Sequence, residues 1–216
     1  MSPNRYVVLR WLAALLVLSC ALPANAQQLR LNTNYRSIPQ QPLASPDRIE
    51  VIDFFFYACP YCHELVPHLE RWRSQMPADV VFRRMPVVRH DSWVPLAKVY
   101  FTLEALGVAE RLHNAVYNSY HDDNLALGEE SVLTEWVQKQ GLDRDKFMAI
   151  FRSDEVLRKV DQARAMTRAY DIQATPSVVV DGRYVSSSGM TGGVPQLMPV
   201  VDAMIRLVRN EREKSK

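Results

Sequence analysis

The chain has 216 residues, of which 48% are hydrophobic and 23% are charged, and its formal net charge at pH 7 is +2. These values exclude a disordered or fibrous protein and leave room for one compact domain with a well-formed core. A net charge so close to zero gives no electrostatic case for binding nucleic acid or an anionic surface.

Residues 1–26 have the pattern of a secretory signal peptide. Arg5 and Arg10 form a positively charged start, residues 11–18 are apolar, and residues 24–26 read Ala-Asn-Ala, a small-x-small cleavage signal. The apolar run is too short to be a stable membrane span. We therefore predict an exported protein.

Cleavage before Gln27 would change both the charge and the cysteine count. The removed segment carries two arginines and no acidic residue, so its loss would bring the net charge to zero. It would also remove Cys20 and leave two cysteines. A competing hypothesis makes Cys20 the lipidated residue of a lipoprotein. Leu18 fits that pattern poorly, whereas the alanines of residues 24–26 fit ordinary cleavage.

The first half of the predicted mature chain indicates a strand–helix–strand unit. Residues 27–46 are polar and rich in proline, with a short edge strand expected around residues 35–38. The apolar, Phe-rich run 49–57 predicts a central strand covered on both faces. A helix is expected over residues 60–75, since its first residue is a proline. Residues 80–88 predict a parallel strand reached by a right-handed crossover.

Residues 93–170 are predicted to contain helices only. Apolar faces over 96–103 and 132–137 predict two of them, each ended by a glycine. Asp143 and Ser153 are expected to cap the amino termini of two more. The aromatic residues of this region are interpreted as core packing.

Strands return at the carboxy-terminal end. Residues 178–180, the turn Asp181-Gly182 and residues 183–185 predict a β-hairpin. Residues 195–210 predict a closing helix, and the charged tail 211–216 is expected to fray.

The order of these elements predicts an α/β fold. It is a thioredoxin-like core with an all-helical domain inserted after the second core strand. The core would comprise residues 27–92 and 171–216, and the insertion residues 93–170.

The motif Cys59-Pro60-Tyr61-Cys62 carries the predicted chemistry. Two thiols separated by two residues can close or open a small disulfide ring and so exchange electrons with other thiols. Cys59 would cap the helix that begins at Pro60, where backbone N–H groups and the helix dipole lower a thiol pKa below about 8.5. Cys62, one turn into the helix, would face the sheet. The pair thus provides an attacking and a resolving sulfur.

Two other uses of the cysteine pair are less favoured. A structural disulfide across two residues would restrain very little of the unfolded chain. A zinc site would need a second pair of ligands beyond Cys59, Cys62 and His63. We therefore expect no metal and no cofactor other than the redox-active disulfide. The remaining histidines are scattered and read as surface or packed residues: His68, His90, His113 and His121.

The sequence resembles the periplasmic thiol:disulfide oxidoreductases of the DsbA family over nearly the whole mature chain. The matching features are the Phe-rich strand before Cys59, the helical insertion, and Ala-Thr-Pro at 174–176 before the hairpin. The resemblance implies a periplasmic location and a cis-proline at Pro176 facing the cysteine pair. The backbone of Thr175 would then meet an extended substrate peptide through main-chain hydrogen bonds.

The resemblance also gives Asp53 a role. Asp53 lies six residues before Cys59 and matches the family's buried acid, which would relay a proton to or from Cys62. A carboxyl group in an apolar site has a raised pKa and can act as an acid or base near neutrality. The alternative is an exposed strand position, which the apolar flanks disfavour.

Two positions depart from the family pattern. Tyr61 stands where typical members carry His, and Thr175 replaces the usual Val, as in the disulfide isomerases and reductases of the Dsb group. Whether His63 compensates for the missing histidine is left open by the sequence. These differences leave the reaction class intact, but they leave the redox potential open.

The favoured hypothesis is a monomeric dithiol oxidase that acts on reduced exported polypeptides. By resemblance, a DsbB-like membrane quinone oxidoreductase would restore its disulfide. One alternative is a disulfide isomerase or reductase kept reduced by a membrane partner. That alternative is disfavoured because the motif begins soon after the predicted cleavage point and leaves no room for a dimerisation domain. The other is a non-enzymatic chaperone or binding module on the same fold.

Overall fold

The structure is a computed structural model that describes residues 28–215. The predicted signal peptide and Cys20 lie outside these residues.

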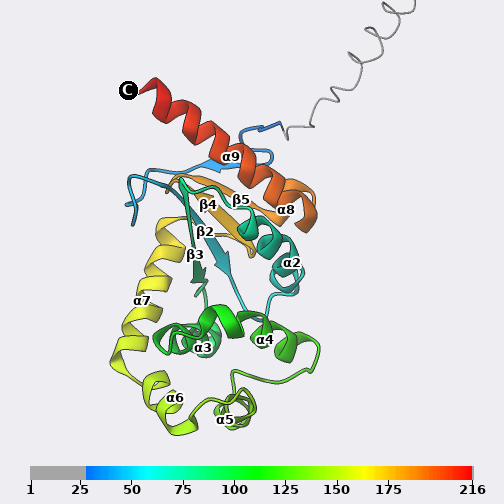
Figure 1. Cartoon of the computed structure of the whole chain (residues 1–216), viewed down its shortest axis with the longest axis vertical. Helices are drawn as coiled ribbons and strands as arrows, with labels where there is room; N and C mark the ends of the chain where they lie inside the picture. Colours follow the sequence, from blue (N-terminus) through cyan, green and yellow to red (C-terminus); the bar gives the residue numbers. More distant parts are fainter. Residues whose placement is uncertain (1–27, 216) are drawn as a thin grey trace, which may run out of the picture.

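A five-stranded mixed sheet lies at the centre of the molecule, with strand order β1-β5-β4-β2-β3 (Figure 1). β2 and β3 are parallel, as predicted, and the other neighbouring pairs are antiparallel. Every residue of β2 is buried, which fits its apolar sequence. The strands are β1 (Arg36–Ser37), β2 (Ile49–Phe55), β3 (Val80–Pro86), β4 (Ser177–Val180) and β5 (Tyr184–Ser187).

Helices cover both faces of the sheet and continue beyond one end of it (Figure 1). Two core clusters share the side chains of β2: Val51 packs with α2 and α9, whereas Ile52 and Phe54 pack with helices of the insertion. The insertion follows β3 and ends before β4, which confirms an all-helical insertion after the second core strand. The α-helices are α2 (Pro60–Ser74), α3 (Val94–Ala105), α4 (Ala109–His121), α5 (Glu130–Lys139), α6 (Arg144–Phe151), α7 (Asp154–Ala169), α8 (Ser188–Thr191) and α9 (Val194–Lys214), and a single 3-10 turn, η1, spans Asp91–Trp93.

Most predicted boundaries agree with the structure to within two residues, including those of β2, α2 and β3. The two helix caps predicted in the insertion are confirmed, whereas Cys59 occupies the capping position of α2 without a side-chain hydrogen bond to the helix. The Asp143 carboxylate accepts a hydrogen bond from the backbone N–H of Lys146 at 2.9 Å. The Ser153 hydroxyl accepts one from the backbone N–H of Val156 at 3.3 Å. These side chains satisfy amide groups that a helix leaves without an internal partner.

The sequence prediction was incomplete in the insertion and wrong in the hairpin turn. It gave no separate helix for α4, although Leu112 and Val116 lie one turn apart on its buried side, beside His113 and Tyr117. The turn has three residues, not two, because Val180 pairs with Tyr184 and leaves Arg183 outside the strand. The loop expected before the closing helix also contains the short helix α8.

The prediction of a frayed tail was wrong, because α9 continues to Lys214. Its last turns are tied to the hairpin. Glu211 accepts hydrogen bonds from the Arg183 guanidinium at 2.6 Å and the Tyr184 hydroxyl at 2.7 Å. Arg212 forms an ion pair with the buried carboxylate of Asp181. Sequence position alone did not reveal these contacts.

Candidate active site

Cys59 stands at the amino terminus of α2, as predicted. Its φ and ψ angles of −87° and 117° are extended, and its carbonyl accepts from the N–H groups of Cys62 at 3.1 Å and His63 at 3.2 Å. Pro60 follows at the first helical position, where a missing N–H costs no hydrogen bond. Both cysteines are free thiols. Cys59 is half-buried, whereas Cys62 is only 3% exposed.

The two thiols have opposite pKa shifts. The pKa of Cys59 falls from 9.0 to about 6 because Cys62 donates a hydrogen bond to its thiolate; partial burial opposes this fall, and Thr175 and backbone N–H groups reinforce it. Burial raises the pKa of Cys62 well above its ordinary value, and its hydrogen bond to Cys59 adds to the increase. At neutral pH the pair therefore holds one thiolate, on Cys59, and one thiol, on Cys62.

We expect the ultraviolet absorbance of the Cys59 thiolate to titrate with a midpoint near pH 6. An unfolded chain binds this proton until about pH 8.5, so ionisation stabilises the reduced fold. This stabilisation is complete above the unfolded pKa and is lost as the pH falls through about 6. The oxidised protein, which has neither thiol, is the control and should lack both the titration and its effect on stability.

The Cys62→Ala variant tests the cause of the low pKa. It removes the Cys62 thiol, the largest contribution to stabilising the Cys59 thiolate, so the midpoint should rise. An unchanged midpoint would assign the stabilisation to Thr175 and the backbone N–H groups at the helix terminus.

The Thr175–Pro176 peptide bond is cis, which confirms the expectation from the family resemblance. This loop lies against the attacking sulfur. The Sγ atom of Cys59 donates to the backbone carbonyl of Thr175 at 3.3 Å. That contact favours the thiol, whereas the Thr175 side chain acts on the thiolate and lowers the Cys59 pKa. The backbone of Thr175 thus contacts the sulfur, and its side chain lowers the Cys59 pKa.

Tyr61 and His63 do not replace the missing histidine through their side chains. The Tyr61 side chain is exposed, and only its backbone N–H helps to lower the pKa of Cys59. His63 turns toward α4, where its ring stacks on His121 with centroids 5.0 Å apart. Its Nε2 atom lies 3.1 Å from Oδ1 of Asn118. His63 therefore links α2 to α4.

Asp53 lies in β2 between its two neighbouring strands and is 3% exposed, as the apolar flanks predicted. Burial raises its pKa to about 7, and the charges of Arg84 and Arg73 reduce this increase. Within residues 28–215 its Oδ1 atom has no hydrogen-bond partner. Asp53 and Cys62 line one small cavity of about 10 Å³, about the space that one water molecule occupies. The carboxyl group and the Cys62 thiol therefore border the same small space.

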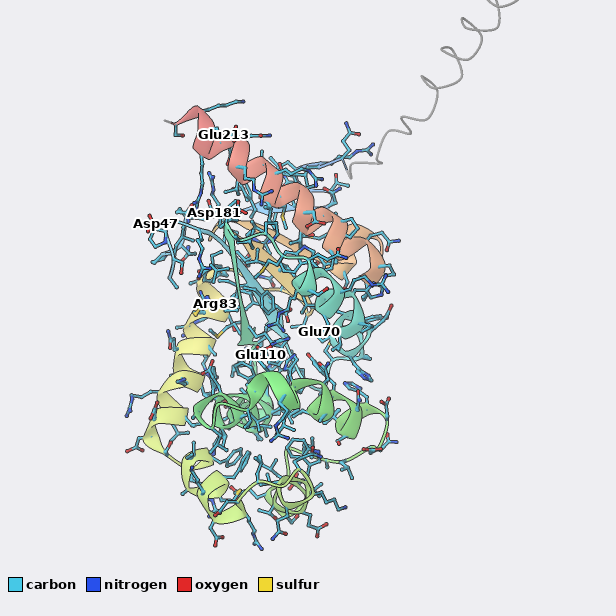
Figure 2. All side chains as sticks on the ribbon, viewed as in Figure 1. Asp47, Glu70, Arg83, Glu110, Asp181 and Glu213 are labelled. Carbon is cyan, nitrogen blue, oxygen red and sulfur yellow. The ribbon has the colours of Figure 1, made fainter. Side chains whose placement is uncertain are left out.

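An ion network beside this cavity was missed by sequence reasoning. The Arg84 guanidinium is 2% exposed and binds Glu70 of α2 at 2.7 Å and Glu110 of α4 at 2.6 Å. Arg73 binds Glu70 at 3.1 Å and Glu110 at 2.7 Å. Figure 2 shows Glu70 and Glu110 side by side between the sheet and the insertion. No sequence pattern marked Arg84, because the strand register that places it beside Asp53 is visible only in the structure.

The described residues hold neither a metal cluster nor a membrane-spanning helix. No group of three or more His, Cys, Asp or Glu side chains in residues 28–215 is arranged to bind a metal ion. No helix in the same range has the length and apolar character needed to cross a bilayer.

Comparisons with known proteins agree with this geometry. Residues 68–198 match the family model for a DSBA-like thioredoxin domain. The thiol:disulfide interchange protein DsbA of Azotobacter vinelandii is 31% identical over 84% of this chain and 86% of its own. The protein of the same name from Bordetella pertussis is 35% identical over 91% of this chain and 94% of its own.

Solved structures show the same relationship. The crystal structure of Pseudomonas aeruginosa DsbA superposes with a TM-score of 0.81 and 27% identity, covering 86% of this chain and 97% of that one. The DsbA structure from Xylella fastidiosa gives a TM-score of 0.78 and 28% identity, covering 84% and 98%. The protein therefore belongs to the DsbA-like thioredoxin family and is a thiol:disulfide oxidoreductase.

Proposed function

We propose that this oxidoreductase introduces disulfides into exported proteins through a Cys59–Cys62 disulfide. The observation that carries the proposal is the difference between the two sulfurs. Cys59 is accessible and has a pKa of about 6, whereas Cys62 is buried and has a raised pKa. A low pKa stabilises the reduced form at neutral pH, which makes the disulfide form a stronger oxidant.

The reaction has two exchange steps. A substrate thiolate attacks Sγ of Cys59, forming a mixed disulfide and breaking the bond to Cys62, whose sulfur leaves with the electron pair and takes up a proton. A second substrate thiolate then attacks the substrate sulfur of the mixed disulfide, and Cys59 leaves as a thiolate. The substrate loses two electrons and two protons, and the enzyme dithiol carries the electrons.

Asp53 supplies or accepts the proton at Cys62. Its pKa of about 7 keeps both protonation states populated near neutrality, which suits a group that transfers a proton in either direction. The small cavity that both side chains line provides the route.

The substrate chain lies across Thr175 and past Tyr61. The Thr175 carbonyl beside Cys59 is a main-chain group that can bind any extended polypeptide, whatever its sequence. On the other side of the motif, a cavity of about 610 Å³ is lined by Tyr61, Glu64 and the Gly192-Gly193 loop between α8 and α9. Its glycine-rich wall suits substrates of varied side chains.

Family membership and the amino-terminal sequence support a periplasmic location. Residues 1–26 would be removed on export, and lipidation of Cys20 is the less favoured outcome. We further propose that the protein acts as a monomer on reduced exported polypeptides. A DsbB-like membrane quinone oxidoreductase would remove the electrons that the dithiol has gained.

Mixing the oxidised protein with a reduced dithiol peptide tests the proposal. We expect one peptide disulfide per protein and a reduction potential above the value of about −270 mV for thioredoxin. Alkylation of cells with a thiol reagent should find the pair mostly oxidised. A pair found reduced in cells would favour the isomerase or reductase alternative. Thr175 is the residue of the sequence that indicates this alternative. Failure to oxidise the peptide would favour a chaperone or binding module.

A further inference from the structure

A further cavity, with a polar lining, lies beside the loop that leads to Pro176. Its volume is about 290 Å³, and its lining comes from the segment after β3, the carboxy-terminal end of α7 and residues 171–173 that follow it. Neither the cysteine chemistry nor the fold requires it. The lining includes the guanidinium groups of Arg89, Arg164 and Arg168.

The charges around this cavity do not balance. Asp171 is the single carboxylate in its lining, and Arg36 outside the lining pairs with it at 3.1 Å. Arg164 pairs with Asp91 at 2.8 Å. Counting these pairs leaves Arg89 and Arg168 as excess positive charge, and both are exposed.

The two excess arginines differ in what they already bind. Arg89 donates to the backbone carbonyl of Gln173 and so holds the loop. Arg168 has no hydrogen-bond or ion-pair partner among residues 28–215. Guanidinium groups bind carboxylates in a planar, two-point geometry. Arg168 is therefore the group with free capacity for an anionic ligand.

The cavity lies within reach of a substrate held at Cys59. The Sγ atom of Cys59 contacts the Thr175 carbonyl, and Gln173, which lines the cavity, is two residues earlier in the chain. Extended chains advance about 3.3 Å per residue, so a substrate running along this loop reaches Gln173 within about two residues. A side chain about two to four residues from the substrate cysteine meets the arginines.

We propose that this cavity is a subsite for an acidic side chain of the substrate polypeptide, with Arg168 as its specificity-determining residue. The inference rests on the proposed function, since the substrate cysteine must first engage Cys59. Such a subsite makes the enzyme selective among substrate polypeptides according to the charge near their reacting cysteine. Binding to the main chain at Thr175 does not depend on the sequence of the substrate.

Matched dithiol peptides test the proposal. One pair carries Glu or Gln three residues after the reacting cysteine, and a second pair carries them three residues before it, because either chain direction fits the loop. All termini are blocked, so a terminal carboxylate cannot substitute. We expect one Glu peptide to exceed its Gln partner in kcat/KM by about two- to fivefold, as for a single exposed ion pair. The preference should disappear near 1 M salt.

Substitutions then assign the effect. Arg168→Gln should abolish the preference for Glu and leave the Gln peptides unchanged, and Arg168→Glu should favour a Lys peptide instead. Arg158→Gln is the matched control: it removes the same charge from the exposed side of the same helix, about 15 Å away, and should keep the preference.

The outcomes separate the two proposals. If the Gln peptides are oxidised but neither Glu peptide is preferred, or if Arg158→Gln removes the preference as fully as Arg168→Gln does, the subsite proposal is wrong. If no peptide is oxidised, the oxidase itself is wrong.

Discussion

Cys59→Ser should lose disulfide transfer completely, because no other described cysteine is exposed enough to be attacked by a substrate thiolate. Serine is nearly isosteric, so the fold should be retained. The measurement is the rate at which the oxidised protein forms a disulfide in a reduced dithiol peptide. A Cys59→Ser protein that still oxidises the peptide would refute the assignment of Cys59 as the attacked sulfur.

Cys62→Ala should give the opposite result, an accumulation of trapped complexes. This variant cannot form the Cys59–Cys62 disulfide, so its Cys59 thiolate enters a mixed disulfide by attacking a disulfide already present in a substrate, which expels one substrate thiolate. Without the Cys62 thiol, no intramolecular attack can then release the chain bound to Cys59. Disulfide-linked complexes should therefore appear on non-reducing gels and vanish on reduction. The double variant Cys59→Ser with Cys62→Ala is the control and should trap nothing.

Asp53→Asn should stabilise the protein above pH 7 while slowing the reaction. Raising the pKa of Asp53 from 3.8 to about 7 corresponds to about 4 kcal/mol of free energy by which burial disfavours the ionised form. Because the folded pKa is the higher one, this cost is absent below about pH 4, grows through pH 7 and is constant above it. Asparagine never ionises, so its advantage should follow the same curve.

The measurement is the free energy of urea unfolding for oxidised wild type and Asp53→Asn from pH 4 to 8. The expected gain at pH 8 is up to about 4 kcal/mol, less the cost of burying an amide without a partner. Asp161→Asn, at an exposed position of α7, is the control and should change stability by about 0.5 kcal/mol or less. A pH-independent gain would show that ionisation of Asp53 is not its source. The attack of a substrate thiolate on the Cys59–Cys62 disulfide should slow in Asp53→Asn, since the departing Cys62 sulfur loses its proton donor.

Sequence patterns predicted the parts of the fold that depend on local signals. The apolar run of β2, the proline that starts α2 and the capping side chains of Asp143 and Ser153 each predict an element from a few adjacent residues. The burial of Asp53 was predictable too, because its neighbours on the central strand are apolar and the strand is covered on both faces.

The remaining features depend on contacts between distant segments. Arg84 becomes part of the site only because β3 pairs with β2 in one register and because α4 folds back from the insertion. His63 turns away from Cys59 because α4 offers it a stacking surface. α4 itself was overlooked, although Leu112 and Val116 lie one turn apart on its buried side.

The Arg84 network has a consequence for how sequences of this type can diverge. One buried guanidinium has two carboxylate partners, Glu70 and Glu110, that come from separate parts of the chain. Loss of either carboxylate leaves the other in place, whereas loss of both leaves the buried guanidinium without either of these partners. The arrangement is redundant, so each acid is individually replaceable while the arginine is not. Substitutions at the two glutamates should therefore be tolerated one at a time, in either order, but not together.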